Sequence, residues 1–260
     1  MFNIIKMTTN GNMIDIFSIP VYYISFGKNL ELEKRLIEQG FTNINHFEAI
    51  NGKKLKIKEL KKKQIITVRT YVDLIKLRSE KWGIPSLGAV GCTLSHNELW
   101  KKCVNENMEH IIIVENDLIF KKKFSNEDLE FINDSLKESK SSFFGSLTYK
   151  HNRMNVMSGT QFCILSKDCC KELTKNVFPI DVQTDIYISF LANIGLIKIN
   201  CKYITTQKNH NSLIQTICIK CDLPNNSLFY YLFIFILLCL LFGLCYYFYN
   251  YRRCVETIKK

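Results

Sequence analysis

Residues 110–120 read His110-Ile-Ile-Ile-Val-Glu-Asn-Asp-Leu-Ile-Phe120, and this stretch decides the fold. Its four β-branched residues, 111–114, predict a strand buried on both faces, as in a parallel sheet. The apolar run stops at Glu115 and Asp117. Ligands of open α/β sheets bind where strands end, and paired oxygen ligands there suit Mg²⁺ or Mn²⁺ carrying a diphosphate. The alternative is that the two acids merely end a strand.

A helix is predicted before this strand, over Gly88–Asn105. It places Cys92, His96 and Trp100 four residues apart on one face. Ser95 and His96 are adjacent and point about 100° apart on a helix, which argues against a Ser–His nucleophile pair. Cys92 and His96 can ligate a metal together, but no further thiolate or imidazole is near them in sequence. We expect this helix to pack beside the ligand site, with His96 hydrogen-bonding the ligand or backbone.

The flanking sequence predicts a β-α-β opening and further helices. A strand is expected at Ile19–Ile24, and a second strand follows around residues 46–49. The helix between them has Leu32, Leu36 and Ile37 on its apolar face and Gly40 at its C-cap. A later helix opens with the capping box of Ser125 and Asp128. Its inward residues are Leu129, Ile132 and Leu136.

These motifs, in this order, resemble glycosyltransferase family 25, which includes bacterial lipooligosaccharide galactosyltransferases and animal procollagen galactosyltransferases. The resemblance covers about residues 20 to 215. Besides the helix motif Gly91-Cys-x-x-Ser-His-x-x-x-Trp100 and the acidic strand end, it rests on Val21–Ile24, Phe47–Gly52, Gly159–Ser166, Pro179-Ile-Asp181, and Gln207 with Ser212-Leu-Ile. The chain departs from the family pattern at Ser25–Lys28, Ala89 and Asn116, the last replacing the middle acid.

The resemblance implies a GT-A type nucleotide-sugar transferase domain, with a Rossmann-like mixed sheet and flanking helices. It implies transfer of a hexose, galactose or glucose, from a UDP-sugar to an acceptor hydroxyl with inversion. Asp117 and Glu115 are the expected ligands of Mn²⁺ or Mg²⁺. Glu115, Asn116, His96 and Ser95 are the expected contacts of the donor. The acceptor, a glycan, lipid or protein, cannot be read from the residues.

A general base is expected in the segment Asp181-Val-Gln-Thr-Asp185, which is predicted to begin a helix. On one helical turn the two carboxylates share a face. Asp185 lies further inside, where desolvation would raise its pKa, so Asp185 is favoured as the base and Asp181 as a donor or acceptor contact. The alternative is that both only complement the helix dipole. The helix is expected to direct Ile186, Phe190, Leu191 and Ile194 to the core.

Two other function classes are compatible with the residues. One is a catalytically silent relative that serves as a membrane-anchored binding or scaffold protein, which the loss of the middle acid favours. The other is a metal-dependent nucleotidyltransferase, whose phosphate-cradling Gly-rich loop is missing. The net charge of +11 suits anionic partners, but no nucleic-acid-binding motif accompanies it. Nucleic acid is therefore not an expected partner.

A membrane anchor is predicted near the end of the sequence. Residues 228–249 carry no charge, are long enough to cross a hydrocarbon core of about 30 Å, and have tyrosines at both ends. The expected organisation is a transferase domain at 13–215, a linker at 216–227, a transmembrane helix at 228–250 and a basic tail at 251–260.

The side of the membrane on which the domain lies is read from two conflicting cues. No signal peptide is visible, which predicts a single-pass C-terminal anchor with a cytosolic domain. The basic tail conflicts with this, because the positive-inside tendency would place the tail, on the other side of the span, in the cytosol. We favour the cytosolic domain. The lysines of residues 53–63 are either a solvated face or a contact for anionic lipid. The eleven cysteines form no disulfide framework and suit a reducing compartment. The Asn-, Ile- and Lys-rich composition suggests an AT-rich genome, such as that of a virus.

Overall fold

The computed structural model describes residues 13–76, 83–146, 148–151, 154–157 and 159–207. All of them belong to one compact unit, Met1–Thr216. The strands are β1 (Val21–Ser25), β2 (Ile44–Glu48), β3 (His110–Glu115), β4 (Leu118–Phe120), β5 (Ser142–Gly145), β6 (Thr148–His151), β7 (Met154–Met157), β8 (Phe162–Ser166), β9 (Lys198–Cys201) and β10 (Thr205–Gln207). The helices are α1 (Leu30–Gln39), η1 (Gly52–Lys54), α2 (Ile57–Lys62), α3 (Val68–Lys76), α4 (Leu87–Asn105), α5 (Asn126–Lys137), α6 (Lys167–Asn176) and α7 (Thr184–Asn193).

The central sheet has six strands in the order β2-β1-β3-β8-β5-β9. β1 pairs in parallel with β2 and β3, and β5 with β9, while β8 runs antiparallel to both of its neighbours. The predicted strand over 111–114 and the β-α-β opening are confirmed, but the sheet is mixed around β3. Since Val114 pairs with Phe162, β8 begins where β3 ends, and the loop before β8 lies at the carboxyl end of β3.

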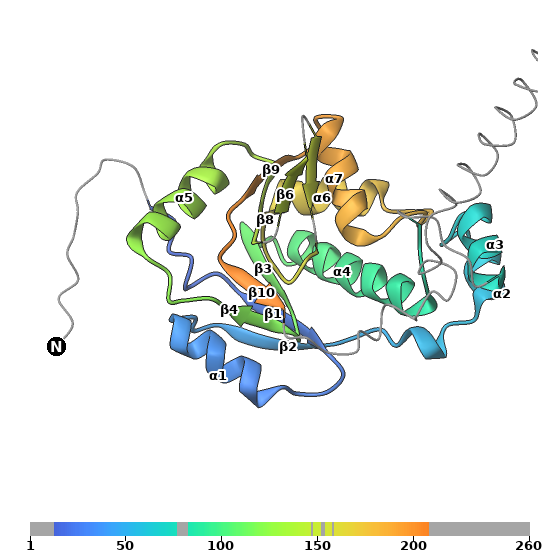
Figure 1. Ribbon diagram of the computed structural model, residues 1–260, viewed down its shortest axis with the longest axis horizontal. Coiled ribbons are helices and arrows are strands. Elements are labelled where there is room, and N and C mark those ends of the chain that lie inside the picture. The colour runs from blue at the N-terminus through green and yellow to red at the C-terminus, as the bar shows by residue number, and fades with distance from the viewer. Residues whose placement is uncertain (1–12, 77–82, 147, 152–153, 158, 208–260) are drawn as a thin grey trace, which may run out of the picture. The chain divides into compact units, whose positions relative to one another are not determined.

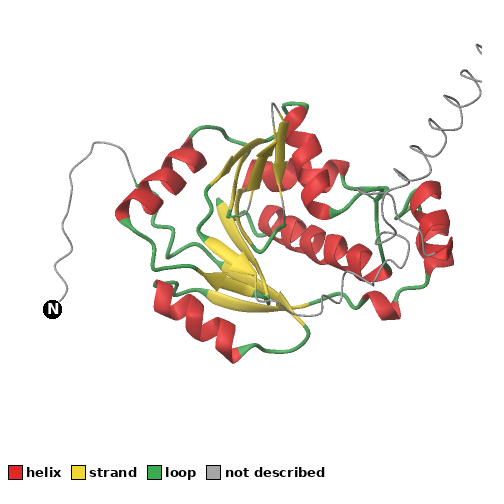
Figure 2. Ribbon diagram, viewed as in Figure 1, coloured by secondary structure: helices red, strands yellow, loops and turns green. Residues whose placement is uncertain are grey.

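Helices cover both faces of this sheet, as expected for the α/β class (Figures 1 and 2). The side chains of β3 alternate between two apolar clusters, as the period of a strand requires. Ile111 and Ile113 join the cluster that contains residues of α4, α6 and α7. Ile112 and Val114 join the cluster that contains residues of α1 and α5. β3 is therefore buried on both faces.

The predicted helix ends are confirmed at α1 and α5. The Asn29 side chain accepts a hydrogen bond from the Leu32 amide, and Gly40 ends α1 with a φ of 113°. Such a φ favours glycine because a Cβ strains the left-handed region. Ser125 and Asp128 form the complete capping box of α5. One expectation was wrong: Ile37 is 62% exposed, since the narrow apolar stripe of α1 turns only Leu32 and Leu36 inward.

The start of α7 also differs from the prediction. The helix begins at Thr184, and Asp181 lies before it in an extended segment. Bridges from Ile180 to Ile66 and from Val182 to Gly83 hold this segment extended, so the two acids do not share a helical turn.

The inward face of α7 is likewise set by tertiary contacts rather than by the expected pattern. Leu191 is buried as predicted, but Phe190 and Ile194 are 58% and 53% exposed. The core face is instead that of Tyr187, Ile188 and Leu191.

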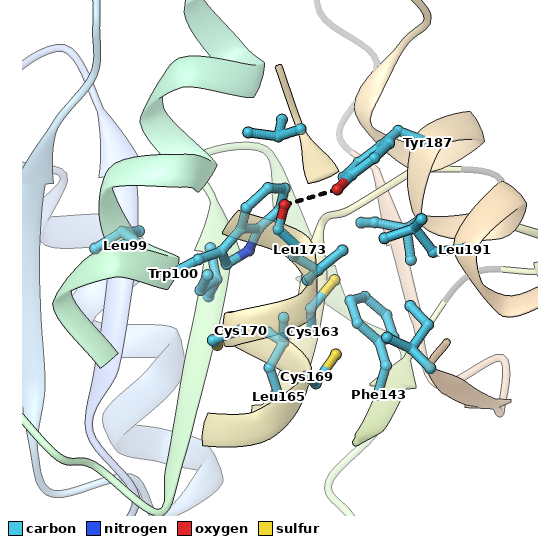
Figure 3. Close-up of a cluster of buried hydrophobic side chains, with 14 of the residues drawn as sticks. Leu99, Trp100, Phe143, Cys163, Leu165, Cys169, Cys170, Leu173, Tyr187 and Leu191 are labelled. Atoms are coloured by element: carbon cyan, nitrogen blue, oxygen red, sulfur yellow. Dashed lines mark hydrogen bonds between the residues drawn. The ribbon is translucent and has the colours of Figure 1, made fainter. Parts of the chain in front are cut away.

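The larger apolar cluster packs α4, α6 and α7 against the sheet (Figure 3). Trp100 of α4 lies at its centre and faces Tyr187 with ring centroids 6.2 Å apart. The Tyr187 hydroxyl donates to the Leu173 carbonyl at 2.6 Å, which satisfies a buried polar group and ties α7 to α6. Cys163, Cys169 and Cys170 fill space in this cluster as free thiols, in keeping with the expectation of small buried residues.

A close backbone contact fixes α4 to the loop after β2. A Cβ on Gly91 would lie 2.4 Å from the Ile50 carbonyl oxygen, and one on Gly52 would lie 2.3 Å from the Leu87 oxygen. The Ser95 hydroxyl closes the contact, because it accepts from the Ile50 amide at 2.9 Å and donates to the Gly91 carbonyl at 2.8 Å. The two motifs Phe47–Gly52 and Gly91–His96 thus meet through their glycines.

Among the described helices, none has the length and apolar character that crossing a membrane requires. The predicted transmembrane segment, 228–250, and the tail 251–260 lie outside the described residues.

The glycine contact predicts an unusual effect of Gly91→Ala. This change in an exposed helix stabilises a protein by about 1 kcal/mol. Here the new methyl group meets the Ile50 carbonyl, so we expect the free energy of unfolding to fall by about 1–3 kcal/mol, the cost of overpacking. Denaturant unfolding of the full chain measures it. Asn105→Ala, at the exposed end of the same helix, is the control and leaves stability unchanged or slightly raised. A stabilised Gly91→Ala variant would contradict the contact.

Candidate functional site

Glu115 is held where three segments meet at the carboxyl edge of the sheet. Its backbone amide donates to the Gln161 carbonyl at 3.0 Å, continuing the β3–β8 ladder. Its carboxylate accepts from the Thr160 hydroxyl and lies 3.3 Å from His96 Nε2 of α4. Its side chain is 14% exposed and that of His96 is 2% exposed. The α4 motif thus contacts the acidic strand end directly, and the partner of His96 is the Glu115 side chain rather than the ligand or backbone expected from the sequence.

This arrangement keeps Glu115 ionised. Burial by itself would raise the pKa of the carboxyl, but the His96 ring and the Thr160 hydroxyl outweigh it and lower that pKa below its usual value. Hydrogen bonds to the charged form and a nearby partial positive charge are the effects that favour a carboxylate. The ionised Glu115 carboxylate, largely buried at this edge of the sheet, can attract a cation.

Cys92 lies on the same face of α4, one turn before His96. The ligand atoms of Cys92, His96 and Glu115 all lie within 4.8 Å of one another. Burial, followed by the charges of Glu115, Asp185 and Asp117, raises the pKa of the Cys92 thiol well above its usual value. A thiol with a raised pKa is neutral at physiological pH.

Asp185 completes this group from the first turn of α7. Its carboxylate accepts from the Gly159 amide at 3.0 Å and from the Ile186 amide at 2.8 Å. Gly159 has a φ of 99°, a conformation that favours glycine and turns its amide toward Asp185. Burial, with a contribution from the charge of Glu115, raises the pKa of Asp185 against the hydrogen bonds that lower it. The direction agrees with the expected desolvation, while the role as a base stays a prediction.

Asp181 has a different environment from Asp185. Arg69 of α3 holds its carboxylate with two nitrogens, Nε at 3.0 Å and Nη2, and the Thr67 hydroxyl donates to it as well. Both charged side chains are about 40% exposed. A carboxylate engaged by a guanidinium fork and a hydroxyl is an anchor between α3 and the segment before α7.

Asn116 and Asp117 follow Glu115 in the turn between β3 and β4. Asp117 is partly buried, whereas the Asn116 side chain is exposed. The Asn116 carbonyl accepts from the side-chain amide of Asn29 at 3.3 Å, which ties this turn to the start of α1. The exposed residues after β1, Phe26 to Lys28, therefore lie beside the acidic turn, where the sequence departs from the family pattern.

Ser95 lies in the glycine contact rather than among the acids. It is 1% exposed, and its hydroxyl both accepts and donates within the protein. These bonds place it as a positioning residue for the loop after β2. A direct donor contact by Ser95 stays a prediction, and its geometry gives that prediction no support.

The site contains two contacts that the sequence did not indicate, those of Thr160 and Gly159. Both precede β8, and they reach the end of β3 only because β8 is inserted antiparallel beside it. The single sequence signal was the glycine at the start of the 159–166 strand motif. Local pattern cannot reveal which strand lies beside β3, so neither partner was foreseeable from spacing.

The donor atoms at this edge fit a divalent cation. Glu115 and Asp117 supply carboxylate oxygens and Asn116 an amide oxygen, the ligand class that Mg²⁺ and Mn²⁺ prefer. The Cys92 sulfur and the His96 nitrogen add softer donors beside them.

Comparison with known proteins gives the family. The model of glycosyltransferase family 25 (LPS biosynthesis protein) matches residues 19–218. The chain belongs to glycosyltransferase family 25.

Curated relatives match over shorter stretches. A "Glycosyltransferase 25 family member" of Anopheles gambiae is 26% identical over 108 residues, which are 40% of this chain and 17% of that protein. "Procollagen galactosyltransferase 2" of Mus musculus is 29% identical over 87 residues, 34% of this chain and 13% of that protein. The match thus spans only 17% and 13% of the lengths of these two relatives. The solved structure of A197 from STIV covers 74% of this chain and 86% of its own with a TM-score of 0.45 and 7% identity, and nothing about function follows from it.

The Glu115 environment predicts the effect of Thr160→Val. A carboxyl whose folded-state pKa is lowered stabilises the fold above its usual pKa of about 4.3, and this contribution is lost as the pH falls through the folded-state value. Removing the hydroxyl raises the pKa of Glu115 toward its unfolded-state value, so the variant has less of this contribution at neutral pH and loses less stability than wild type as the pH falls. We expect about 1.5–3 kcal/mol less stability at neutral pH, the value of a hydrogen bond to a charged group.

Denaturant unfolding of the wild-type chain and of Thr160→Val, from acid to neutral pH, measures this effect. Thr93→Val is the matched control, because the Thr93 hydroxyl lies 2.9 Å from that of Thr184 and donates to the Ala89 carbonyl. The control loses stability by the same amount at every pH. Parallel pH profiles for wild type and Thr160→Val would show that the hydroxyl does not stabilise the ionised Glu115.

Proposed function

We propose that this chain is a hexosyltransferase with a GT-A type domain, which moves galactose or glucose from a UDP-sugar to an acceptor hydroxyl with inversion. One observation carries the proposal. Two partly buried carboxyls, Glu115 and Asp185, are held at one edge of the sheet by the adjacent residues Thr160 and Gly159, and their pKa values are displaced in opposite directions. Such divergence assigns one acid to charge stabilisation and the other to proton transfer. Family membership and the name of the procollagen galactosyltransferase relative support a sugar nucleotide as the substrate.

The donor diphosphate is proposed to bind at the carboxyl edge of the sheet. Asp117 and Glu115 would hold Mn²⁺ or Mg²⁺, which when bound neutralises charge on the leaving diphosphate. His96 and Thr160 keep Glu115 ionised and fix its carboxylate, and the Asn116 amide is exposed to contact the nucleotide. The changed middle acid leaves an oxygen donor but one negative charge fewer.

Asp185 is proposed as the general base. The acceptor hydroxyl loses its proton to the Asp185 carboxylate as its oxygen forms a bond to the anomeric carbon. The bond from that carbon to the diphosphate oxygen breaks, and UDP leaves from the opposite face. A raised pKa makes Asp185 a better proton acceptor near neutral pH than an ordinary aspartate. Its hydrogen bonds to two backbone amides fix the direction of the carboxylate.

A catalytically silent relative is the second candidate, favoured by Asn116 in place of the middle acid. Such a protein binds UDP-sugar without turning it over. The membrane anchor at 228–250 remains a prediction from the sequence for either candidate.

Asp117→Ala is expected to abolish metal-dependent turnover of UDP-galactose and UDP-glucose. The variant loses the carboxylate proposed as the main metal ligand, while the circular dichroism of the full chain stays unchanged. Release of UDP in the presence of Mn²⁺ measures turnover. Asp168→Ala, which removes an exposed acid of α6 paired with Lys171, is the control and keeps wild-type turnover. Wild-type activity in Asp117→Ala would remove this residue from the site.

Asn substitutions separate the roles of the two aspartates. Asp185→Asn is expected to lower transfer by about 10²- to 10⁴-fold, as for other general bases, while donor affinity stays unchanged. Asp181→Asn weakens the Arg69 contact and changes transfer much less, because the carboxylate anchors α3. Transfer to an acceptor and equilibrium binding of UDP-sugar are measured separately. Equal losses of transfer in both variants, or lost donor binding in Asp185→Asn, would refute the assignment of the base.

A further inference from the structure

We propose that Cys92, His96 and Glu115 form a binding site for a thiophilic transition metal of the Zn²⁺ class, with one coordination position left open. This site differs from the oxygen-only site at Asp117 in its donor atoms, which are one sulfur, one nitrogen and one oxygen. It uses Glu115 but does not rest on transferase activity, since a silent relative with the same residues would bind the metal equally.

The backbone already brings the three donors together. Cys92 and His96 are four residues apart in α4, so their side chains project from one face of a continuous 19-residue helix. Glu115 ends β3, whose residues 111–114 are fully buried. His96 Nε2 lies 3.3 Å from Glu115 Oε1, and the Cys92 sulfur lies within 4.8 Å of both atoms. A helix and a strand end, rather than a loop, therefore set the geometry.

The separations between these ligand atoms suit an ion with tetrahedral coordination. Zn²⁺ binds imidazole nitrogen and carboxylate oxygen at about 2.0–2.2 Å and thiolate sulfur at about 2.3 Å, so ligand atoms in one shell lie roughly 3.3–3.6 Å apart. The nitrogen–oxygen pair is already at that separation. The sulfur lies within 4.8 Å of the other two ligand atoms, so an adjustment of at most about 1.2 Å brings it to that separation. Three protein ligands and an open fourth position are the arrangement of zinc sites that also bind a water or substrate atom.

The surrounding charges also favour a cation. Three carboxylates, Glu115, Asp117 and Asp185, act electrostatically on the Cys92 sulfur. Sulfur and imidazole donors select Zn²⁺ and similar ions over Mg²⁺, which prefers oxygen alone. Binding forms a metal–sulfur bond and releases the thiol proton to water. No electron is transferred, so no oxidant or reductant is needed.

Co²⁺ is the probe that tests this site, because a thiolate bound to it gives a charge-transfer band in the near ultraviolet. All samples are full-length chains treated with a chelator, with Cys218→Ser and Cys221→Ser introduced to remove the Cys-x-x-Cys pair. We expect one equivalent of Co²⁺ to give this band together with visible bands of tetrahedral intensity. One equivalent of Zn²⁺ then abolishes both sets of bands.

Variants of α4 identify the sulfur ligand. Cys92→Ser is expected to lose the charge-transfer band, and His96→Gln to weaken Co²⁺ binding by about 10-fold or more, since loss of even an outer-shell partner costs 10–100-fold. Cys103→Ser is the matched control, because this cysteine lies buried in the same helix with its thiol directed to the Met108 carbonyl. It keeps both the band and the affinity.

Three results would overturn the proposal: no band in the parent chain, a band that survives in Cys92→Ser, or equal loss in Cys103→Ser. Circular dichroism of each variant shows that the fold is kept, and Cys92→Ala repeats the measurement should the serine variant unfold. UDP-sugar turnover by the same samples is a separate readout. Turnover is measured with Mn²⁺ on the metal-free parent chain, so its absence contradicts the proposed transferase alone, whereas the Cys92-dependent Co²⁺ band tests the metal site alone.

Discussion

The antiparallel pairing of β3 with β8 is the constraint on which the rest of the site depends. Because β8 runs against its neighbours, the residues before it, and not those after it, lie beside Glu115. Those residues supply the Thr160 hydroxyl to Glu115 and the Gly159 amide to Asp185. One reversed strand thus brings a helix start, a strand end and a loop to one place. A parallel β8 would have delivered Ser166 and the start of α6 there instead.

The carboxyl groups of Glu115 and Asp185 lie in the same region of the site, but their pKa values are shifted in opposite directions. Glu115 is stabilised as an anion by a ring nitrogen and a hydroxyl, whereas Asp185 meets mainly backbone amides, apolar surroundings and the negative charge of Glu115. Each carboxyl therefore influences the other, and any change that neutralises Glu115 also makes Asp185 easier to ionise. The polar groups around the two acids come from three segments, α4, the loop before β8 and α7, so the difference between the two pKa values is a property of the fold and not of either residue.

Local sequence rules predicted the parts of the fold that local physics governs. β3, α4 and the caps of α1 and α5 follow from β-branched runs, i,i+4 spacing and side-chain capping, and the predicted motifs of α4 and β3 do meet. The errors arise where distant contacts decide. Bridges to Ile66 and Gly83 keep Asp181 out of α7, and Phe190 and Ile194 are exposed. Thr160 was missed for the same reason, since strand order is a tertiary property.

The contact between Arg69 and Asp181 connects α3, which lies before Pro85 in the chain, to the segment that leads into Asp185. Residues 180–182 form β-bridges to Ile66 and to Gly83. The ion pair is a third contact of this segment and lies only four residues before Asp185. The ion pair is half exposed, so its strength of about 0–1 kcal/mol falls with added salt. We therefore expect the position of Asp185 to depend on ionic strength through the Arg69–Asp181 ion pair. Substitutions in α3, well away from the acidic turn, can therefore shift the carboxylate of Asp185.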